Sequence, residues 1–203
     1  MQTKIVSVDF QKDFTTAEGC CYKPRPSVNF VKNILVPYLK EKNIKIAEII
    51  SDYRAPRPGD RGVACVPGTV GYESEIPDEV KEKDVWIKCM NSPIWTRENI
   101  GDATKEPGLP YQDTKKFSEW IERVVGSPKD TEVVLVGLTL DCCVLCTAQE
   151  FSFRGYKVKI LKEATDPYSG DETEKDFLCK TPTKNWATVI NWEELKKIYE
   201  REF

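Results

Sequence analysis

Residues 132–144 read EVVLVGLTLDCCV, a continuous apolar run that leads into a turn and the beginning of a helix. An uninterrupted run such as Glu132–Gly137 is typical of a parallel strand covered by helices on both faces. Further strands are predicted at residues 4–9, 44–51, 84–88, 157–161 and 187–190, with helices predicted at residues 27–42, 117–125, 141–154, 171–179 and 192–200. This alternation predicts a single α/β domain over residues 1–203, with a three-layer, Rossmann-like fold. Its six-stranded, mostly parallel sheet would carry helices on both faces.

Polar residues follow several of the predicted strands. Asp9, Asp52 and Lys88 each end or follow a strand, and the turn after Gly137 follows another. Ligands of parallel sheets bind at the carboxyl ends of the strands, near a switch in strand order. Two stretches, residues 53–71 and 91–111, are predicted as long loops of the kind that cover or bind ligands. We therefore expect a site at this edge of the sheet.

The composition narrows the chemistry of such a site. The chain has 203 residues and no histidine, which excludes a Ser-His-Asp triad, a Cys-His dyad and a histidine-ligated metal within it. A net charge of −3 gives no support to nucleic-acid binding, and the apolar runs are too short to cross a bilayer. No apolar signal-peptide core stands near the N-terminus, so we expect a cytoplasmic protein whose eight cysteines are mostly free thiols.

Cys143 is the candidate nucleophile. It is predicted to lie in the first turn of a helix, where free N–H groups and the helix dipole favour a thiolate and lower its pKa. The same N–H groups can hold an oxyanion. In the absence of histidine, the carboxylate of Asp9 can take the thiol proton and the ammonium of Lys88 can stabilise the thiolate.

Three motifs resemble those of the isochorismatase-like cysteine hydrolases, a superfamily that includes nicotinamidases and N-carbamoylsarcosine amidohydrolase. They are VDFQKDF at residues 8–14, WIKCMNS at residues 86–92 and GLTLDCCVLCTA at residues 137–148. The resemblance implies that Asp9, Lys88 and Cys143 form the catalytic set, and that the N–H groups of Thr139 and Cys143 form the oxyanion hole. It also implies a cis peptide between Leu138 and Thr139, and a homo-oligomer.

The chain departs from nicotinamidases where these carry a metal site of one Asp and several His. Asp52 matches the aspartate, but Arg54 and Ala64 stand where that family has histidines. One carboxylate cannot hold a metal alone, so neither metal nor cofactor is predicted. Arginine binds carboxylates in a bidentate manner, and Arg54, Arg57 and Arg61 are candidates for binding an anionic group of the substrate. A solvated basic loop is the alternative.

These features predict hydrolysis of a small amide or ureido C–N bond through a thioester on Cys143. Isochorismatase-type hydrolysis of a vinyl ether is one alternative. A non-catalytic or thiol-redox protein on the same fold is another, and Cys143 and Cys146 form a C-x-x-C pair that fits a redox role. Cys20, Cys21 and Cys142 receive no role from the sequence.

Overall fold

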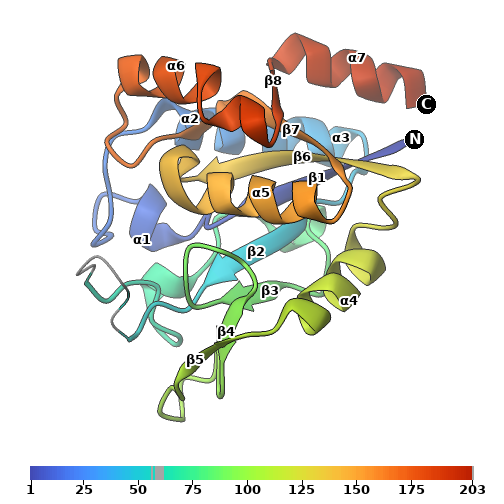
Figure 1. Cartoon of the computed structure of the whole chain (residues 1–203). Coiled ribbons are helices and arrows are strands. Elements are labelled where there is room, and N and C mark those ends of the chain that lie inside the picture. Colours follow the sequence, from blue (N-terminus) through green and yellow to red (C-terminus); the bar gives the residue numbers. More distant parts are fainter. Residues whose placement is uncertain (56, 58–61, 203) are drawn as a thin grey trace.

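A computed structural model describes residues 1–55, 57 and 62–202 of the chain (Figure 1). Its main sheet has six parallel strands in the order β3-β2-β1-β6-β7-β8. This confirms the predicted α/β fold. The strands are β1 (Gln2–Val8), β2 (Ala47–Ser51), β3 (Trp86–Lys88), β6 (Thr131–Leu138), β7 (Lys157–Asp166) and β8 (Thr188–Ile190).

Helices cover the sheet on both sides, with α5 in front of it and α2 and α3 behind it in the view of Figure 1. Residues 133–136 are fully buried between these layers, as the apolar run predicts. The helices are α1 (Lys12–Thr15), α2 (Pro26–Phe30), α3 (Val36–Glu41), α4 (Thr114–Val124), α5 (Leu145–Phe153), α6 (Glu172–Lys180) and α7 (Trp192–Glu202).

The helix predicted over residues 27–42 is interrupted. Between α2 and α3 lies a π-helical turn, Val31–Leu35, in which the N–H of Val36 donates to the carbonyl of Val31. Pro37 follows at the start of α3 and has no N–H to donate, so the regular hydrogen-bond ladder cannot continue through it. The prediction of one regular helix is corrected for this reason.

The segment 91–111 also differs from its prediction as a plain loop. It contains β4 (Trp95–Arg97) and reaches β5 (Pro110–Gln112), and these two short strands form an antiparallel pair outside the main sheet. Strand β7 runs to Asp166, beyond the predicted end, because its register shifts opposite Leu135–Gly137 and pairing then resumes. The short strands β4 and β5 were not predicted because this segment contains three prolines and two glycines, which indicate a loop.

The order of the strands places a topological switch between β1 and β6. The chain builds β2 and β3 outward on one side of β1 and then returns to add β6 on the other side. Gly137 permits the close approach of these two strands: its φ is +107°, and a Cβ there would lie 2.1 Å from the carbonyl oxygen of Val8. The carboxyl ends of β1 and β6 therefore flank the expected ligand crevice.

Within the described part of the chain, no helix has the length and apolar character needed to span a membrane.

Candidate active site

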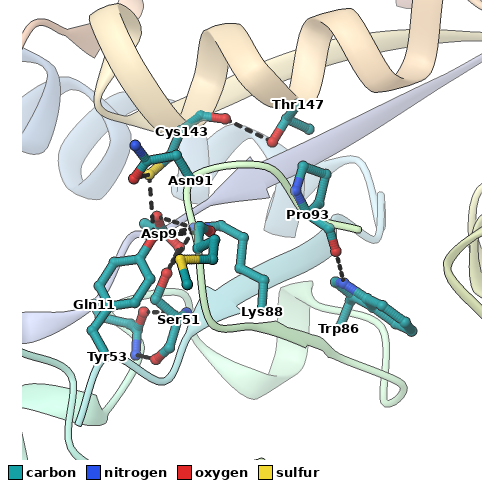
Figure 2. A network of polar contacts seen from close by, with 11 residues as sticks. Asp9, Gln11, Ser51, Tyr53, Trp86, Lys88, Asn91, Pro93, Cys143 and Thr147 are labelled. Carbon is teal, nitrogen blue, oxygen red and sulfur yellow. Dashed lines mark hydrogen bonds and ion pairs between the residues drawn. The ribbon is translucent and has the colours of Figure 1, made fainter. Parts of the chain in front are cut away.

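Asp9 and Lys88 form a fully buried ion pair at the carboxyl edge of the sheet. Asp9 follows β1 in a left-handed backbone conformation with φ of 49°, uncommon outside glycine, and Lys88 ends β3. The Lys88 ammonium donates to Asp9 Oδ2 at 2.8 Å, and the Ser51 hydroxyl donates to Asp9 Oδ1 at 2.7 Å (Figure 2). Burial by itself lowers the pKa of Lys88, but the charge of Asp9 and the nearby Cys143 outweigh it and leave this pKa raised.

Tyr53 connects this ion pair to Cys143. Its hydroxyl accepts a hydrogen bond from Lys88 Nζ at 2.5 Å and lies 3.3 Å from Cys143 Sγ (Figure 2). It also donates to the carbonyl of Met90 at 3.2 Å. The side chain is fully buried, and burial, followed by the proximity of Cys143 and Asp9, raises its pKa well above the ordinary value. The phenol is therefore neutral at physiological pH.

Cys143 lies in a π-helical turn, Leu140–Val144, between β6 and α5. The residue is 5% exposed, and its sulfur lies 3.8 Å from Asn91 Oδ1, while its carbonyl accepts a hydrogen bond from Thr147 Oγ1 (Figure 2). The predicted lowering of its pKa is wrong for this structure. Contact with the Cys142 thiol, followed by burial, raises the pKa of Cys143 well above its ordinary value, although the Lys88 charge acts in the opposite direction. The resting group is thus a thiol.

Gln11 fixes the end of β2, on which two of these side chains depend. Its amide donates to the carbonyl of Ser51 at 2.9 Å and accepts from the N–H of Ser51 at 2.7 Å. A further hydrogen bond runs from the amide to the carbonyl of Tyr72. Gln11, Ser51 and Tyr53 were missed at the sequence level. The only signal was their position, inside the first motif and beside the strand-end Asp52.

A cavity of about 460 Å³ opens beside Cys143. The side chains at its wall are partly aromatic and partly thiol-bearing. Its lining comprises Phe14, Cys20, Cys21, Tyr53, Arg57, Gly62, Val63, Thr139, Asp141, Cys142, Cys143 and Tyr168. Tyr53 and Cys143 belong to this lining, whereas Asp9 and Lys88 are buried behind it.

The turn after β6 contains the cis peptide that the resemblance implies. The peptide bond between Leu138 and Thr139 is cis. The N–H groups of Cys142 and Val144 donate to the carbonyl of Thr139 at 3.0 and 3.1 Å. Thr139 and Cys143, whose N–H groups are the predicted oxyanion donors, both line the cavity. Their role as donors stays a prediction.

Arg54 does not belong to the cavity lining, so its predicted contact with substrate is not supported. Its guanidinium pairs with the buried carboxylate of Asp52 at 3.1 Å. Its two terminal nitrogens also donate to backbone carbonyls of the segment 99–105, while its Nε is buried without a hydrogen-bond partner. With a side chain only 9% exposed, Arg54 acts as a structural partner of Asp52, which also accepts from the N–H of Gly101 at 2.9 Å.

Arg57 does line the cavity. Its guanidinium lies over the ring of Tyr53, 3.5 Å from the ring centroid, and its Nε is buried with no hydrogen-bond partner. An unpaired buried donor is costly unless a ligand satisfies it. The third arginine of the prediction, Arg61, lies outside the described residues.

None of the eight cysteines forms a disulfide bond, Cys143 and Cys146 included, in line with the expectation that most of them are thiols. Among the described residues, no group of three or more Cys, Asp or Glu side chains is arranged to hold a metal ion.

Comparison with known proteins defines the class of the fold. No family model matches the chain. The fold matches the crystal structure of an isochorismatase-like hydrolase from Alkaliphilus metalliredigens, with a TM-score of 0.66, 17% sequence identity and coverage of 98% of this chain and 99% of that one. A pyrazinamidase of Pyrococcus horikoshii in complex with zinc matches with a TM-score of 0.64 and 16% identity, over 95% of this chain and 100% of that one. The chain therefore has the isochorismatase-like hydrolase fold, and the resemblance predicted from the motifs is confirmed.

One particular enzyme is similar in sequence as well. Nicotinamidase from Saccharomyces cerevisiae is 25% identical over an alignment of 205 positions, gaps included, that covers 84% of this chain and 90% of that protein.

Proposed function

We propose that this chain is a cysteine-dependent hydrolase that cleaves a C–N bond of a small amide or ureido compound. The observation that carries the proposal is the unbroken set of contacts from Asp9 through Lys88 and Tyr53 to the Cys143 thiol at the wall of the cavity. The similarity to nicotinamidase, an enzyme named for an amide, supports the same reaction class.

The reaction begins with the Cys143 thiol in its neutral form. Its proton passes to the carboxylate of Asp9 while the sulfur attacks the substrate carbonyl, so that no free thiolate has to accumulate in the buried site. The positive charge of Lys88 and the hydroxyl of Tyr53 stabilise the sulfur as it becomes anionic. The N–H groups of Thr139 and Cys143 hold the oxyanion.

The thioester then forms and is hydrolysed. The C–N bond breaks as Asp9 returns the proton to the leaving amine. A water molecule, deprotonated by Asp9, attacks the thioester carbonyl and releases the carboxylic or carbamic acid together with the Cys143 thiol. The buried ion pair holds Asp9 ready for both transfers, since Ser51 and Lys88 fix its two oxygens.

Arg57 suggests that the substrate carries an anionic group. Its unpaired buried Nε and its place in the cavity lining support a contact with a substrate carboxylate, at a distance from the carbonyl that reacts. The aromatic side chains of Phe14 and Tyr168 line the same cavity and favour a compact, partly apolar substrate body.

A metal site of the nicotinamidase type does not fit this chain. The carboxylate that would hold the ion, that of Asp52, pairs instead with the permanent charge of Arg54 and with the N–H of Gly101. We therefore propose a metal-independent reaction. Incubation with EDTA followed by dialysis is expected to leave kcat and KM unchanged, and a loss of activity restored by zinc would contradict this part of the proposal.

The direct test compares wild type with Cys143→Ala on a panel of primary amides, nicotinamide among them, and ureido acids. Each acidic compound is paired with an uncharged analogue. We expect release of ammonia or amine by the wild type and a loss of at least about a thousandfold in the variant, with an unchanged circular dichroism spectrum. Activity that survives this substitution would favour the vinyl-ether alternative. A panel without turnover, together with a Cys143–Cys146 disulfide that cycles with reductant, would favour the redox alternative.

We also propose a homo-oligomer in the cytoplasm, as members of the resembled superfamily are usually oligomeric. Size-exclusion chromatography with light scattering checks the first part, and fractionation of the source cells checks the second.

A further inference from the structure

Two adjacent thiols line the cavity on a segment that the proposed reaction does not use. Cys20 is exposed and Cys21 is half-buried, and their sulfur atoms lie 3.8 Å apart. Both belong to the lining of the cavity that contains Cys143. Because Cys20 is exposed to solvent, the pair lies where the cavity meets the surface.

The backbone holds this pair in place. The N–H of Cys21 donates to the carbonyl of Asp13 at 3.0 Å, and the N–H of Cys20 donates to Asp13 Oδ1 at 3.4 Å. The buried guanidinium of Arg25 donates to the carbonyl of Cys21 through both terminal nitrogens, at 3.5 and 3.4 Å. A ligand that bridges the two sulfurs therefore finds them already side by side and loses little free energy to ordering them.

The number of available donors selects the ligand. Thiols are soft donors and prefer soft acceptors. No third Cys, Asp or Glu of the described chain completes a metal-binding group here, so a divalent ion such as zinc would lack the four ligands it requires. A monosubstituted trivalent arsenic centre brings one carbon ligand of its own and needs only two sulfurs.

We propose that Cys20 and Cys21 form a binding site for monosubstituted trivalent arsenicals, R–As(III). With an arsonous acid, R–As(OH)₂, two As–S bonds form while two As–O and two S–H bonds break, and two water molecules leave. The arsenic stays trivalent, and no oxidant or reductant is required. The exchange consumes neutral thiols, which suits Cys20: partial desolvation of its sulfur, followed by the neighbouring Cys21 and Asp13, raises its pKa to about 12.

The adduct would obstruct the cavity. Its substituent R must extend from the sulfur pair toward Val63 or Tyr168, which line the same opening, or toward solvent. Inhibition of hydrolysis by the adduct rests on the proposed function, whereas binding itself does not.

The test uses phenylarsine oxide on the reduced full-length chain, with intact-mass spectrometry as the readout. We expect one phenylarsenic group per wild-type chain, removed by ethanedithiol and resistant to an equal concentration of a monothiol. Cys20→Ser and Cys21→Ser are each expected to bind phenylarsine oxide at least about a hundredfold more weakly than the wild type, because the second As–S bond is lost. Cys143→Ala should bind as the wild type does.

The matched comparison is the other adjacent pair, Cys142 and Cys143, which lines the same cavity but is buried. An adduct that disappears in Cys143→Ala and persists in Cys20→Ser would overturn the proposal, and so would the absence of any adduct on wild type. Thermal melting of each serine variant checks that it is folded, and Cys20→Ala offers a second substitution at the exposed position. A wild type that binds one group but hydrolyses no amide would leave this site standing and contradict the proposed function.

Discussion

At the scale of single residues, Tyr53 links the buried Asp9–Lys88 ion pair to Cys143, the proposed nucleophile. Lys88 and Asp9 are both fully buried, and neither lines the cavity. The Tyr53 hydroxyl contacts both the Lys88 ammonium and the Cys143 sulfur, so a neutral phenol lies between the positive charge and the proposed nucleophile. The role of Tyr53 is therefore visible only from its contacts with Lys88 and Cys143.

Replacing Tyr53 by Phe tests this link. The substitution removes the hydroxyl and keeps the ring beneath Arg57. We expect kcat to fall about ten- to hundredfold, the loss of a hydrogen bond to a developing charge, with KM little changed. Tyr111→Phe, at a position where the side chain is exposed, is the matched control. Equal rates in wild type and Tyr53→Phe would leave the tyrosine without a part in the reaction.

The reactivity of Cys143 toward iodoacetamide should depend on pH in a defined direction. Because its pKa is raised, the thiolate should form only well above the usual value for a free cysteine, about 8.5. Lys88 lowers this pKa, so Lys88→Met should move the titration to still higher pH. Peptide mass spectrometry of alkylated protein across the pH range measures both shifts. A titration below that of free cysteine would contradict the neutral resting thiol.

At the scale of elements, the contact between β1 and β6 decides where the site forms. The two strands pair over seven residues, and Gly137 lies against the backbone of Val8 at the end of that pairing. The next residue after Val8 is Asp9, so the proposed base and the turn that carries the proposed nucleophile are positioned by one strand contact.

Gly137→Ala is expected to destabilise the protein by about 3 kcal/mol or more, since it combines a forbidden backbone conformation with a backbone clash. Gly155→Ala is the matched control. It also has a positive φ, of +84°, but a Cβ there would meet no atom within 4 Å. Backbone conformation alone should cost about 1 kcal/mol. Urea denaturation of both variants separates the two contributions, and equal costs would argue against the close approach.

The Asp52–Arg54 pair joins the end of β2 to the segment 99–105. Arg54→Ala leaves the Asp52 carboxylate, which is 0% exposed, without its counter-charge, and should cost about 3 kcal/mol of stability. Arg123→Ala removes an exposed pair with Asp84 and should cost no more than about 1 kcal/mol.

Arg54 and Arg57 are expected to differ in role, the first structural and the second in substrate binding. With an acidic substrate, Arg57→Ala should raise KM about tenfold or more, the loss of one charged hydrogen bond, whereas folded Arg54→Ala should keep the wild-type KM. Steady-state kinetics at a temperature where both variants are folded provides the measurement. A raised KM in Arg54→Ala alone would restore the assignment that the structure does not support.

At the scale of the whole molecule, several buried acids are held neutral. Burial raises the pKa of Cys65, of Tyr53 and of Tyr72, the last to about 12, and Cys143 is raised as well. Above pH of about 8.5 the unfolded chain loses cysteine protons that the folded chain keeps, so the free energy of unfolding must fall as pH rises. The raised pKa of Lys88 acts in the same direction, at higher pH, where its stabilising charge is lost.

Urea denaturation at pH 7.5 and 9.5 under reducing conditions checks this decline. Cys65→Ala should show a smaller decline than wild type, because it removes one fully buried thiol from the balance. A stability that is constant or rises between these two values would contradict the direction given for these groups.

The sequence was sufficient for the fold to be predicted, because the fold depends on patterns local in the chain. It also singled out Asp9, Lys88 and Cys143, which the structure brings together and whose catalytic roles stay a prediction. The apolar run at residues 132–137 and the strand-end charges belong to this kind of signal. The pKa of Cys143, the role of Arg54 and the contact of Tyr53 could not be predicted in this way. Each depends on which side chains the folded chain brings into contact. A helix-terminus argument for Cys143 includes neither its contact with Cys142 nor its burial, which together raise its pKa.

The strand order has a consequence for how the protein matures. Asp9, Ser51, Lys88 and Cys143 come from the ends of three different strands and the turn after a fourth, and they lie within residues 9–143. Strand β6 pairs with β1 but follows β2 and β3 in the chain. No contiguous fragment that stops before that strand contains Cys143, the proposed nucleophile. During synthesis from the N-terminus, a growing chain thus gains its reactive centre only when its central strand pairing is complete. Turnover would report the fraction of molecules that have finished folding, not those that are merely compact.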